Sequence, residues 1–257
     1  MKRSPLDILS YPRGVIVTTL GALHTLVMCF VTLFLALVIK QSKIVDWAIN
    51  YLWCMPLMWL SGVRVDVRGA EYVRKDGKGF LVLFNHSSLF DILVLFGHFP
   101  RQLRFGAKVE LFKIPFFGRA MAACGMLPID RASRSKVMKV YDHAISRVEA
   151  GECFALAPEG TRQDNVQLGK FKRGPFEFAI NAKMDIVPVV LSGVLNVLPK
   201  HAIFANMGRW RRTVIMHISP PVPGSEYTME TIDNLQNLVR GQMEQVFIAN
   251  TQELKGL

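Results

Sequence analysis

An uncharged stretch of 26 residues, Gly14 to Ile39, limits how this chain can fold more than any other feature. A helix rises 1.5 Å per residue, so about 20 residues cross the ~30 Å hydrocarbon core of a bilayer. The stretch exceeds the apolar core of about 7 to 15 residues in a cleaved signal peptide, and no small-residue cleavage site follows it. We therefore expect this segment to stay in the protein and to contact a membrane.

A second uncharged run, Trp47 to Val63, covers 17 residues but is interrupted by Asn50 and Pro56. By length it is only a marginal membrane span. Along the first stretch, small side chains recur at helical steps of three or four residues, which would let the second run approach closely. These residues are Gly14, Thr18, Gly21, Thr25, Cys29, Thr32 and Ala36.

The link between the two runs carries two lysines, and two full spans would place both outside, against the positive-inside tendency. We predict instead that residues 1–63 form an N-terminal two-helix motif, embedded as a hairpin from the cytoplasmic face of a membrane, the inner membrane in a bacterium. Lys2, Arg3 and Arg13 would then lie on anionic headgroups, which suits the net charge of +11. Two ordinary spans remain the alternative.

The pattern changes after this motif, where valines alternate with charged residues from Val63 to Val67, as in a half-buried strand. Helical spacing of apolar residues predicts amphipathic helices over 135–150 and 228–248. Short apolar runs predict strands buried on both faces at 80–84, 153–157 and 186–191. Strands alternating with helices predict one mixed α/β domain over residues 64–257.

Several classes of protein are excluded or disfavoured by missing signals. The four cysteines form no CxxC pair, which predicts reduced, mostly buried thiols and no metal site. The HExxH, P-loop and GxSxG motifs are absent. Basic residues are dispersed and not interleaved with aromatic residues, so we expect no nucleic-acid partner.

Polar residues follow the first buried run: Asn85-His86-Ser87-Ser88-Leu89-Phe90-Asp91. His86 and Asp91 are five residues apart, about 500° around a helix, so a contact needs His86 in a loop and Asp91 in the first turn of a helix capped by Ser88. Asp91 would then accept the Nδ1 proton of His86, leaving Nε2 to take a proton from a substrate hydroxyl. Alternatively, Asp91 only supports the helix start and His86 is a partly buried imidazole with a backbone partner.

A second loop, Pro158-Glu159-Gly160-Thr161-Arg162, follows the run at 153–157. Gly160 permits a tight turn, Thr161 can donate to an anion, and the planar fork of Arg162 suits a phosphate. An ordinary turn with a solvated arginine remains the alternative.

Two further basic residues, Lys108 and Arg131, flank an apolar stretch at 111–127. We expect this stretch to line an apolar channel or to lie on the bilayer.

Four short motifs occur in order along the chain: Asn-His-x4-Asp at 85–91, Ala-Lys-x-Glu-Leu-x3-Pro-x2-Gly at 107–118 followed by Ile-Asp-Arg at 129–131, Pro-Glu-Gly-Thr-Arg at 158–162, and Val-Pro-Val at 187–189. Their order and spacing resemble those of the glycerophosphate and lysophosphatidic acid acyltransferase family. The resemblance covers about residues 60 to 220. Each motif is weak, but the four together are highly specific.

The resemblance implies a single mixed α/β acyltransferase domain on a membrane. Such an enzyme moves a fatty acyl group from a co-substrate, acyl-CoA or acyl carrier protein, to the free hydroxyl of a lysophospholipid, without a cofactor or metal. With 1-acylglycerol 3-phosphate as acceptor, the product is phosphatidic acid. His86 and Asp91 fall on the family's catalytic pair. The residues expected to hold the acceptor's glycerophosphate are Lys108, Arg131, Glu159, Gly160, Thr161 and Arg162.

The acceptor stays open because Ala157 stands where the third motif usually has phenylalanine, whose loss could widen the pocket. Another lysolipid, such as a lyso-ornithine lipid, is therefore an alternative, as is a catalytically idle lipid-binding scaffold. A tetrahedral intermediate also needs an oxyanion donor. We expect a backbone N–H near the start of the helix at 88–97 or within 187–189.

Overall fold

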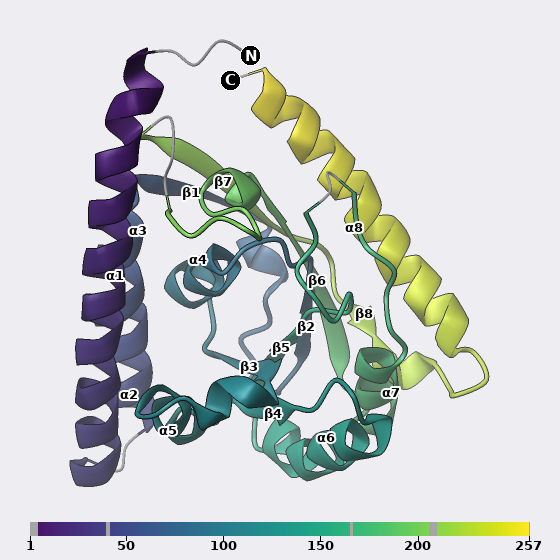
Figure 1. Ribbon diagram of the computed structural model, residues 1–257. Helices are drawn as coiled ribbons and strands as arrows, with labels where there is room; N and C mark the ends of the chain where they lie inside the picture. The colour runs from purple at the N-terminus through teal and green to yellow at the C-terminus, as the bar shows by residue number, and fades with distance from the viewer. Residues whose placement is uncertain (1–4, 40–41, 165–166, 206–209, 257) are drawn as a thin grey trace.

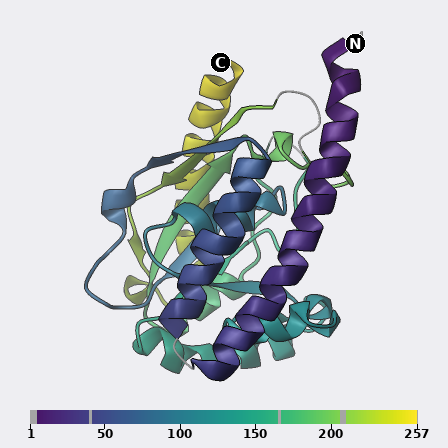
Figure 2. The same cartoon turned by 90° about the vertical axis from the view of Figure 1, so that its left-hand side faces the viewer.

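The two apolar runs form two long helical segments that lie side by side and antiparallel (Figures 1 and 2). The computed structural model describes residues 5–39, 42–164, 167–205 and 210–256, so the predicted positions of Lys2 and Arg3 lie outside the described residues. The first segment is α1 (Pro5–Val38). The second consists of α2 (Ser42–Trp47), the π-helical η1 (Ala48–Cys54) and α3 (Met55–Leu60).

The second segment is fixed both to α1 and to the rest of the protein. Trp53 Nε1 donates to Thr25 Oγ1 at 3.0 Å. Asn50, which interrupts the apolar run, donates through Nδ2 to Gln102 Oε1 at 3.0 Å. Asp46 accepts two hydrogen bonds from Arg104, at 2.6 and 2.9 Å. The polar residues of this run therefore attach the helix to the α/β part of the chain.

The predicted strands form one mixed sheet in the order β1-β7-β6-β2-β5-β3-β4, with β8 paired to β6. All neighbours along this path are parallel except β6 and β7, and β8 is also antiparallel to β6. The strands are β1 (Val63–Arg68), β2 (Leu81–Phe84), β3 (Leu103–Lys108), β4 (Leu127–Ile129), β5 (Cys153–Leu156), β6 (Asp185–Ser192), β7 (Arg212–Ile218) and β8 (Val222–Pro223).

Helices cover both faces of this sheet, as expected for an α/β fold with buried parallel strands. The remaining α-helices are α4 (Phe90–His98), α5 (Phe117–Ala123), α6 (Arg134–Glu149), α7 (Gly174–Asn181) and α8 (Ile232–Lys255). The short 3-10 helices are η2 (Ala70–Tyr72), η3 (Val109–Lys113), η4 (Val194–Asn196) and η5 (Gly224–Glu226).

The helix predicted over 135–150 is confirmed by α6, but the one predicted over 228–248 has wrong bounds. It begins at Ile232, because Thr228 and Thr231 form a turn in which the Thr228 N–H donates to Thr231 Oγ1 at 2.9 Å. It continues to Lys255, since the chain contains no glycine or proline between Ile248 and Gly256.

The core divides into two clusters, one on each face of the sheet. One includes buried side chains from α3, α4 and β3, and the other includes side chains from α6, α7 and α8. All four cysteines are buried, which confirms the predicted burial of these thiols.

Candidate active site

Two loops meet beyond the carboxyl ends of adjacent parallel strands, where α/β folds commonly place their chemistry. β2 leads into the loop that carries His86, and its neighbour β5 leads into the loop that carries Arg162. Parallel pairing makes both strands end at the same edge of the sheet. The two motifs, about 70 residues apart in the sequence, therefore form one site.

The predicted contact between His86 and Asp91 is present, with Nδ1 of the imidazole 2.8 Å from Oδ2 of the carboxylate. The backbone N–H groups of Ser87 and Ser88 donate to the same oxygen at 2.7 and 2.9 Å. Asp91 is completely buried, whereas the side chain of His86 is 13% exposed. With Nδ1 donating to Asp91, Nε2 is free to accept a proton.

The predicted capping role of Ser88 is only partly right. The helix begins at Phe90, two residues later than Ser88, and Leu89 is its N-cap residue. Ser88 Oγ still accepts from the Phe90 N–H at 3.2 Å, but it donates to the Leu198 carbonyl at 2.7 Å. Ser88 therefore links the start of α4 to the segment that follows η4.

Glu159 holds the backbone of His86, a role that the motif alone did not reveal. Its Oε2 accepts from the His86 N–H at 2.9 Å and its Oε1 accepts from the Gly169 N–H at 2.8 Å. Glu159 is 4% exposed, and burial raises the pKa of its carboxyl group, while the two N–H donors act to lower it. The Gln163 N–H donates to the His86 carbonyl at 2.7 Å, so the second loop holds His86 on both sides.

Asn85 fixes the point at which the first loop leaves the sheet. Its side chain donates to the Leu191 carbonyl at 2.9 Å and accepts from the Leu191 N–H at 2.7 Å. These two bonds replace the strand pairing between β2 and β6 where β2 ends. The sequence motif contains this asparagine, but its partner on β6 could not be read from the sequence.

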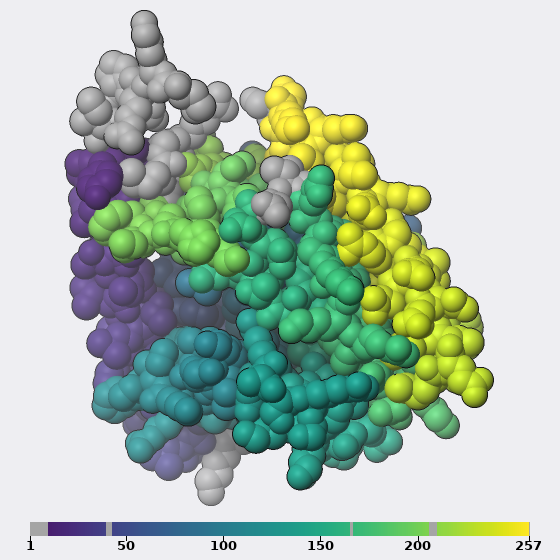
Figure 3. Space-filling view, turned by 45° about the vertical axis from the view of Figure 1, so that its right-hand side comes forward, coloured from purple at the N-terminus to yellow at the C-terminus, as the bar shows by residue number. Residues whose placement is uncertain are grey.

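A cavity of about 960 Å³ opens beside His86. In the space-filling view the surface is hollowed between α1, the segment near residue 200 and α5 (Figure 3). Four of the six predicted phosphate-binding residues line this cavity together with His86: Lys108, Arg131, Thr161 and Arg162. The structure thus brings together residues from three of the four motifs.

Two of these basic side chains are available to bind a ligand. Among the residues that the structure describes, no hydrogen bond or ion pair engages the guanidinium of Arg131 or of Arg162. Burial lowers the pKa of Arg131. Lys108 is half-exposed and 3.6 Å from Glu110. Lys200 also lines the cavity, 3.8 Å from Asp164, although no motif marked it in the sequence.

The other predicted site residues lie beside the cavity and not on its described lining. The Glu159 carboxylate accepts hydrogen bonds from two backbone N–H groups. Gly160 has φ of +71°, and the Lys172 side chain packs over it. Ala157 packs against the core and is not among the described residues that line the cavity. Val187 and Val189 are buried in β6 and paired to β2, which removes that segment as the expected oxyanion donor.

The remainder of the cavity is apolar and follows α1. The small residues predicted to receive the second apolar run do so in part, since Trp53 bonds to Thr25, and they also line this space, at Thr18, Gly21, Thr25, Cys29 and Thr32. A Cβ at Gly21 would lie 3.4 Å from Leu57 of α3, so the second helical segment and the cavity share this face of α1. Residues from the apolar stretch at 111–127 complete the wall, as the channel interpretation predicts, and Ile114 and Phe116 of the same stretch are exposed.

Comparison with known proteins gives one family. The family model described as Acyltransferase matches residues 64–192. The 1-acyl-sn-glycerol-3-phosphate acyltransferase of Saccharomyces cerevisiae is 29% identical over 213 residues, covering 81% of this chain and 68% of the yeast protein. Human 1-acyl-sn-glycerol-3-phosphate acyltransferase alpha is 29% identical over 210 residues, covering 81% of this chain and 72% of the human protein.

A solved structure shares the fold. The crystal structure of the 1-acyl-sn-glycerophosphate (LPA) acyltransferase PlsC from Thermotoga maritima superposes with a TM-score of 0.78 and 24% identity. The match covers 96% of this chain and 98% of the other, so the likeness includes both the N-terminal helices and the mixed sheet.

Proposed function

Because the chain belongs to the acyltransferase family, we propose that it transfers a fatty acyl group from a thioester to the free 2-hydroxyl of 1-acylglycerol 3-phosphate. The product is phosphatidic acid, a precursor in phospholipid synthesis. One observation carries the proposal: a buried carboxylate orients His86 at 2.8 Å, at the edge of an apolar cavity that also contains two uncommitted guanidinium groups.

The proton transfers of the mechanism need only one general base, and the tetrahedral intermediate needs in addition a hydrogen-bond donor for its oxyanion. His86 Nε2 takes the proton of the 2-hydroxyl as its oxygen attacks the thioester carbonyl carbon. The C–S bond then breaks, and the leaving thiolate takes the proton from the imidazolium to give the free thiol. Asp91 stabilises the imidazolium while it exists. The enzyme itself forms no covalent bond to the acyl group.

The cations of the cavity suit the acceptor's phosphate. Arg131 and Arg162 come from loops at the same edge of the sheet as His86, and each can donate two parallel hydrogen bonds to a phosphate. Lys108, Lys200 and the Thr161 hydroxyl add further donors. A phosphate held here would place the glycerol hydroxyls beside His86. The lysophosphatidic acid named for the yeast and human relatives is an acceptor of this kind.

The two N-terminal helical segments form the surface of the protein that contacts the membrane. Ser10–Val38 is long and apolar enough to cross a bilayer, and only 17% of its most apolar window is buried inside the protein. Large apolar side chains are exposed along α1, η1, α3 and the turn before α5: Leu20, Leu23, Val27, Phe30, Phe34, Leu37, Tyr51, Trp59, Ile114 and Phe116. An exposed apolar surface of this kind marks a membrane contact.

A shallow hairpin fits these contacts better than two spans, and the positive-inside tendency supports its entry from the cytoplasmic face. Thr18 accepts a hydrogen bond from the Ala205 N–H at 2.9 Å, and Phe30 contacts the ring of Phe116 at 4.8 Å. α1 therefore lies against the α/β part at both ends of the cavity, and crossing the bilayer would open that cavity. The guanidinium of Arg13, which the sequence predicted to lie on anionic headgroups, is 5.2 Å from the centroid of the Trp210 ring.

Acyl transfer by purified protein in lipid vesicles tests the proposal. The assay offers an acyl-CoA or the acyl carrier protein thioester together with 1-acylglycerol 3-phosphate or one of several other lysolipids. We expect phosphatidic acid from the wild-type protein and none above background from His86→Ala. An equal rate with His86→Ala would contradict the mechanism.

The same assay separates the alternatives. Product formed only from another lysolipid would support the proposed acyl transfer and would show that the acceptor is not 1-acylglycerol 3-phosphate. No product from any acceptor, with a folded and vesicle-bound protein, would favour the idle scaffold. Donor preference is read from the same experiment, since either acidic carrier protein or coenzyme A phosphates suit a basic surface.

A further inference from the structure

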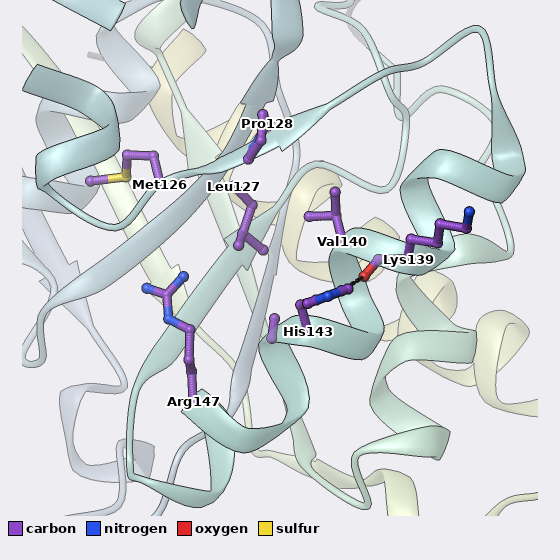
Figure 4. Close-up of a pocket in the computed structure, with 8 residues that line it drawn as sticks. Met126, Leu127, Pro128, Lys139, Val140, His143 and Arg147 are labelled. Atoms are coloured by element: carbon purple, nitrogen blue, oxygen red, sulfur yellow. Dashed lines mark hydrogen bonds between the residues drawn. The ribbon is translucent and has the colours of Figure 1, made fainter. Parts of the chain in front are cut away.

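Basic side chains border the cavity beside His86 and also a smaller cavity of about 340 Å³ between β4 and α6. Those of the smaller cavity are not aimed at a ligand. Arg147 donates to the Gly125 carbonyl at 2.8 Å and to Glu152 at 2.6 Å. In Figure 4 the side chain of Lys139 extends away from β4. The larger cavity is therefore the one whose basic residues suit an anion.

One basic residue of the larger cavity, Lys200, lies in a segment that runs from the start of α4 to α1. At one end of this segment, Ser88 Oγ donates to the Leu198 carbonyl at 2.7 Å. At the other end, the Ala205 N–H donates to Thr18 Oγ1 at 2.9 Å. Lys200 lines the cavity between these two contacts, and its side chain is 27% exposed. The segment therefore holds an ammonium group at the cavity.

Lys200 reaches the proposed phosphate site from a different side than the two arginines. It follows β6, whereas Arg131 follows β4 and Arg162 follows β5. In the sheet, β4 and β5 lie on one side of β2, and β6 lies on the other. A phosphate bound by the two guanidinium groups would therefore be open to Lys200 from the other side.

The partner that Lys200 has in this structure is a weak one. Its Nζ lies 3.8 Å from Oδ2 of Asp164, whose side chain is 49% exposed. An exposed ion pair of this length contributes little, whereas a charge-assisted hydrogen bond to a phosphate is stronger. His201 Nε2 lies 3.5 Å from the same carboxylate oxygen, so Asp164 keeps a neighbour if Lys200 turns to a ligand.

Lysophospholipids carry their phosphate in one of two forms. A phosphomonoester has three unsubstituted oxygens and a charge of about −1.5 to −2 at pH 7. A phosphodiester has two unsubstituted oxygens and a single negative charge, and it bears a headgroup on the remaining oxygen. Because two oxygens are common to both forms, a donor that distinguishes them must lie at the third.

We propose that Lys200 leaves Asp164 to bind the third oxygen of a phosphomonoester, and that it thereby selects this class of acceptor over phosphodiesters. This inference rests on the proposed function. The ammonium group attracts the additional negative charge of the monoester. The segment that carries Lys200 also occupies the side on which a phosphodiester would bear its headgroup. Attraction of one ligand and obstruction of the other both contribute to specificity.

Two competitive inhibitors that lack the reacting 2-hydroxyl test this proposal. One is 3-acyloxypropyl phosphate, a monoester, and the other is the methyl ester of the same phosphate, a diester. The Ki of each is measured against 1-acylglycerol 3-phosphate in the acyl-transfer assay. The wild type should bind the monoester more tightly. Lys200→Met should raise the Ki of the monoester about tenfold and leave that of the diester close to the wild-type value.

Lys139→Met is the matched control, since Lys139 is exposed on α6 and is not among the described residues of the larger cavity. Both Ki values should be unchanged in this variant. A double variant, Lys200→Met with Asp164→Asn, separates phosphate binding from neutralisation of Asp164. The Ki of the monoester should stay raised in the double variant.

A return of that Ki to the wild-type value would overturn the inference, because Lys200 would then only neutralise Asp164. An equal rise for both inhibitors in Lys200→Met would also overturn it. The Ki of the diester shows in addition whether the binding site of each variant is intact. A wild type that transfers no acyl group would instead refute the proposed function, and this inference with it.

Discussion

Two buried carboxylates bond to His86, one from the first turn of α4 and one from the loop after β5, and they bind different parts of it. Asp91 of α4 binds the imidazole and two backbone N–H groups of the loop after β2. Glu159 binds the backbone N–H of His86 from the neighbouring loop. The first contact sets the chemistry of the ring and the second sets its position. Substitutions in the two loops should therefore give different kinetic signatures.

The largest effect is expected from His86→Ala, which removes the base itself. We expect kcat to fall by about 10⁴-fold, the upper end of what a general base contributes, with little change in the KM for the acceptor. Initial rates of phosphatidic acid formation across acceptor concentrations measure both quantities. A loss confined to KM would make His86 a binding residue.

Asp91 allows a sharper test. Its Oδ2 accepts three hydrogen bonds, whereas Oδ1 is buried without a partner among the described residues. In Asp91→Asn the amide oxygen should occupy the Oδ2 position, which keeps the tautomer of His86 and loses only the charge opposite the imidazolium. We expect about a 10²-fold loss of kcat for asparagine and at least ~10³-fold for Asp91→Ala. Equal losses would mean that the hydrogen bond contributes nothing beyond the charge.

In the loop after β5, Arg162→Lys should raise the KM for the acceptor by about 10- to 100-fold and leave kcat close to that of the wild type. A lysine cannot reproduce two parallel hydrogen bonds to a phosphate. The matched control is Arg173→Lys, because Arg173 is half-exposed and faces Asp233 at 3.7 Å outside the cavity lining. An unchanged acceptor KM would remove Arg162 from the phosphate site.

The smallest effect on kcat/KM is expected from Glu159→Gln. The amide nitrogen would face a backbone N–H, so one of two hydrogen bonds is lost, and we expect the free energy of unfolding to fall by about 1–3 kcal/mol. The rate should fall about tenfold through displacement of His86. Denaturant unfolding and kcat are measured beside Glu149→Gln, an exposed residue at the end of α6. If acceptor KM rises and stability does not change, Glu159 acts on the phosphate after all.

The sequence predicted the chemistry of the first loop better than that of the second. The five-residue spacing of His86 and Asp91 requires a loop followed by a helix, and local hydrogen bonding fulfils that requirement. The partner of Glu159 lies 73 residues away in the sequence. Periodicity and motif spacing report local geometry, so they could not distinguish a carboxylate that holds backbone from one that faces a ligand.

In the fold as well, local features could be predicted from the sequence and contacts between distant residues could not. Apolar runs predicted β2, β5 and β6, and helical spacing predicted α6, because burial of a strand or of one helix face leaves a local pattern. The cavity depends on which face of α1 meets which element, and Lys200 reaches it from a segment without a motif. The small residues along α1 predicted that another helix packs closely against it. They did not predict that part of the same face would line a cavity.

The most direct test of the central claim is thiol release from an acyl thioester, measured with and without 1-acylglycerol 3-phosphate. Direct attack by an acceptor hydroxyl that His86 deprotonates predicts release only when the acceptor is present, one thiol for each phosphatidic acid formed, and none above background with His86→Ala. Release without acceptor, together with an acyl group bound covalently to the protein, would contradict the account.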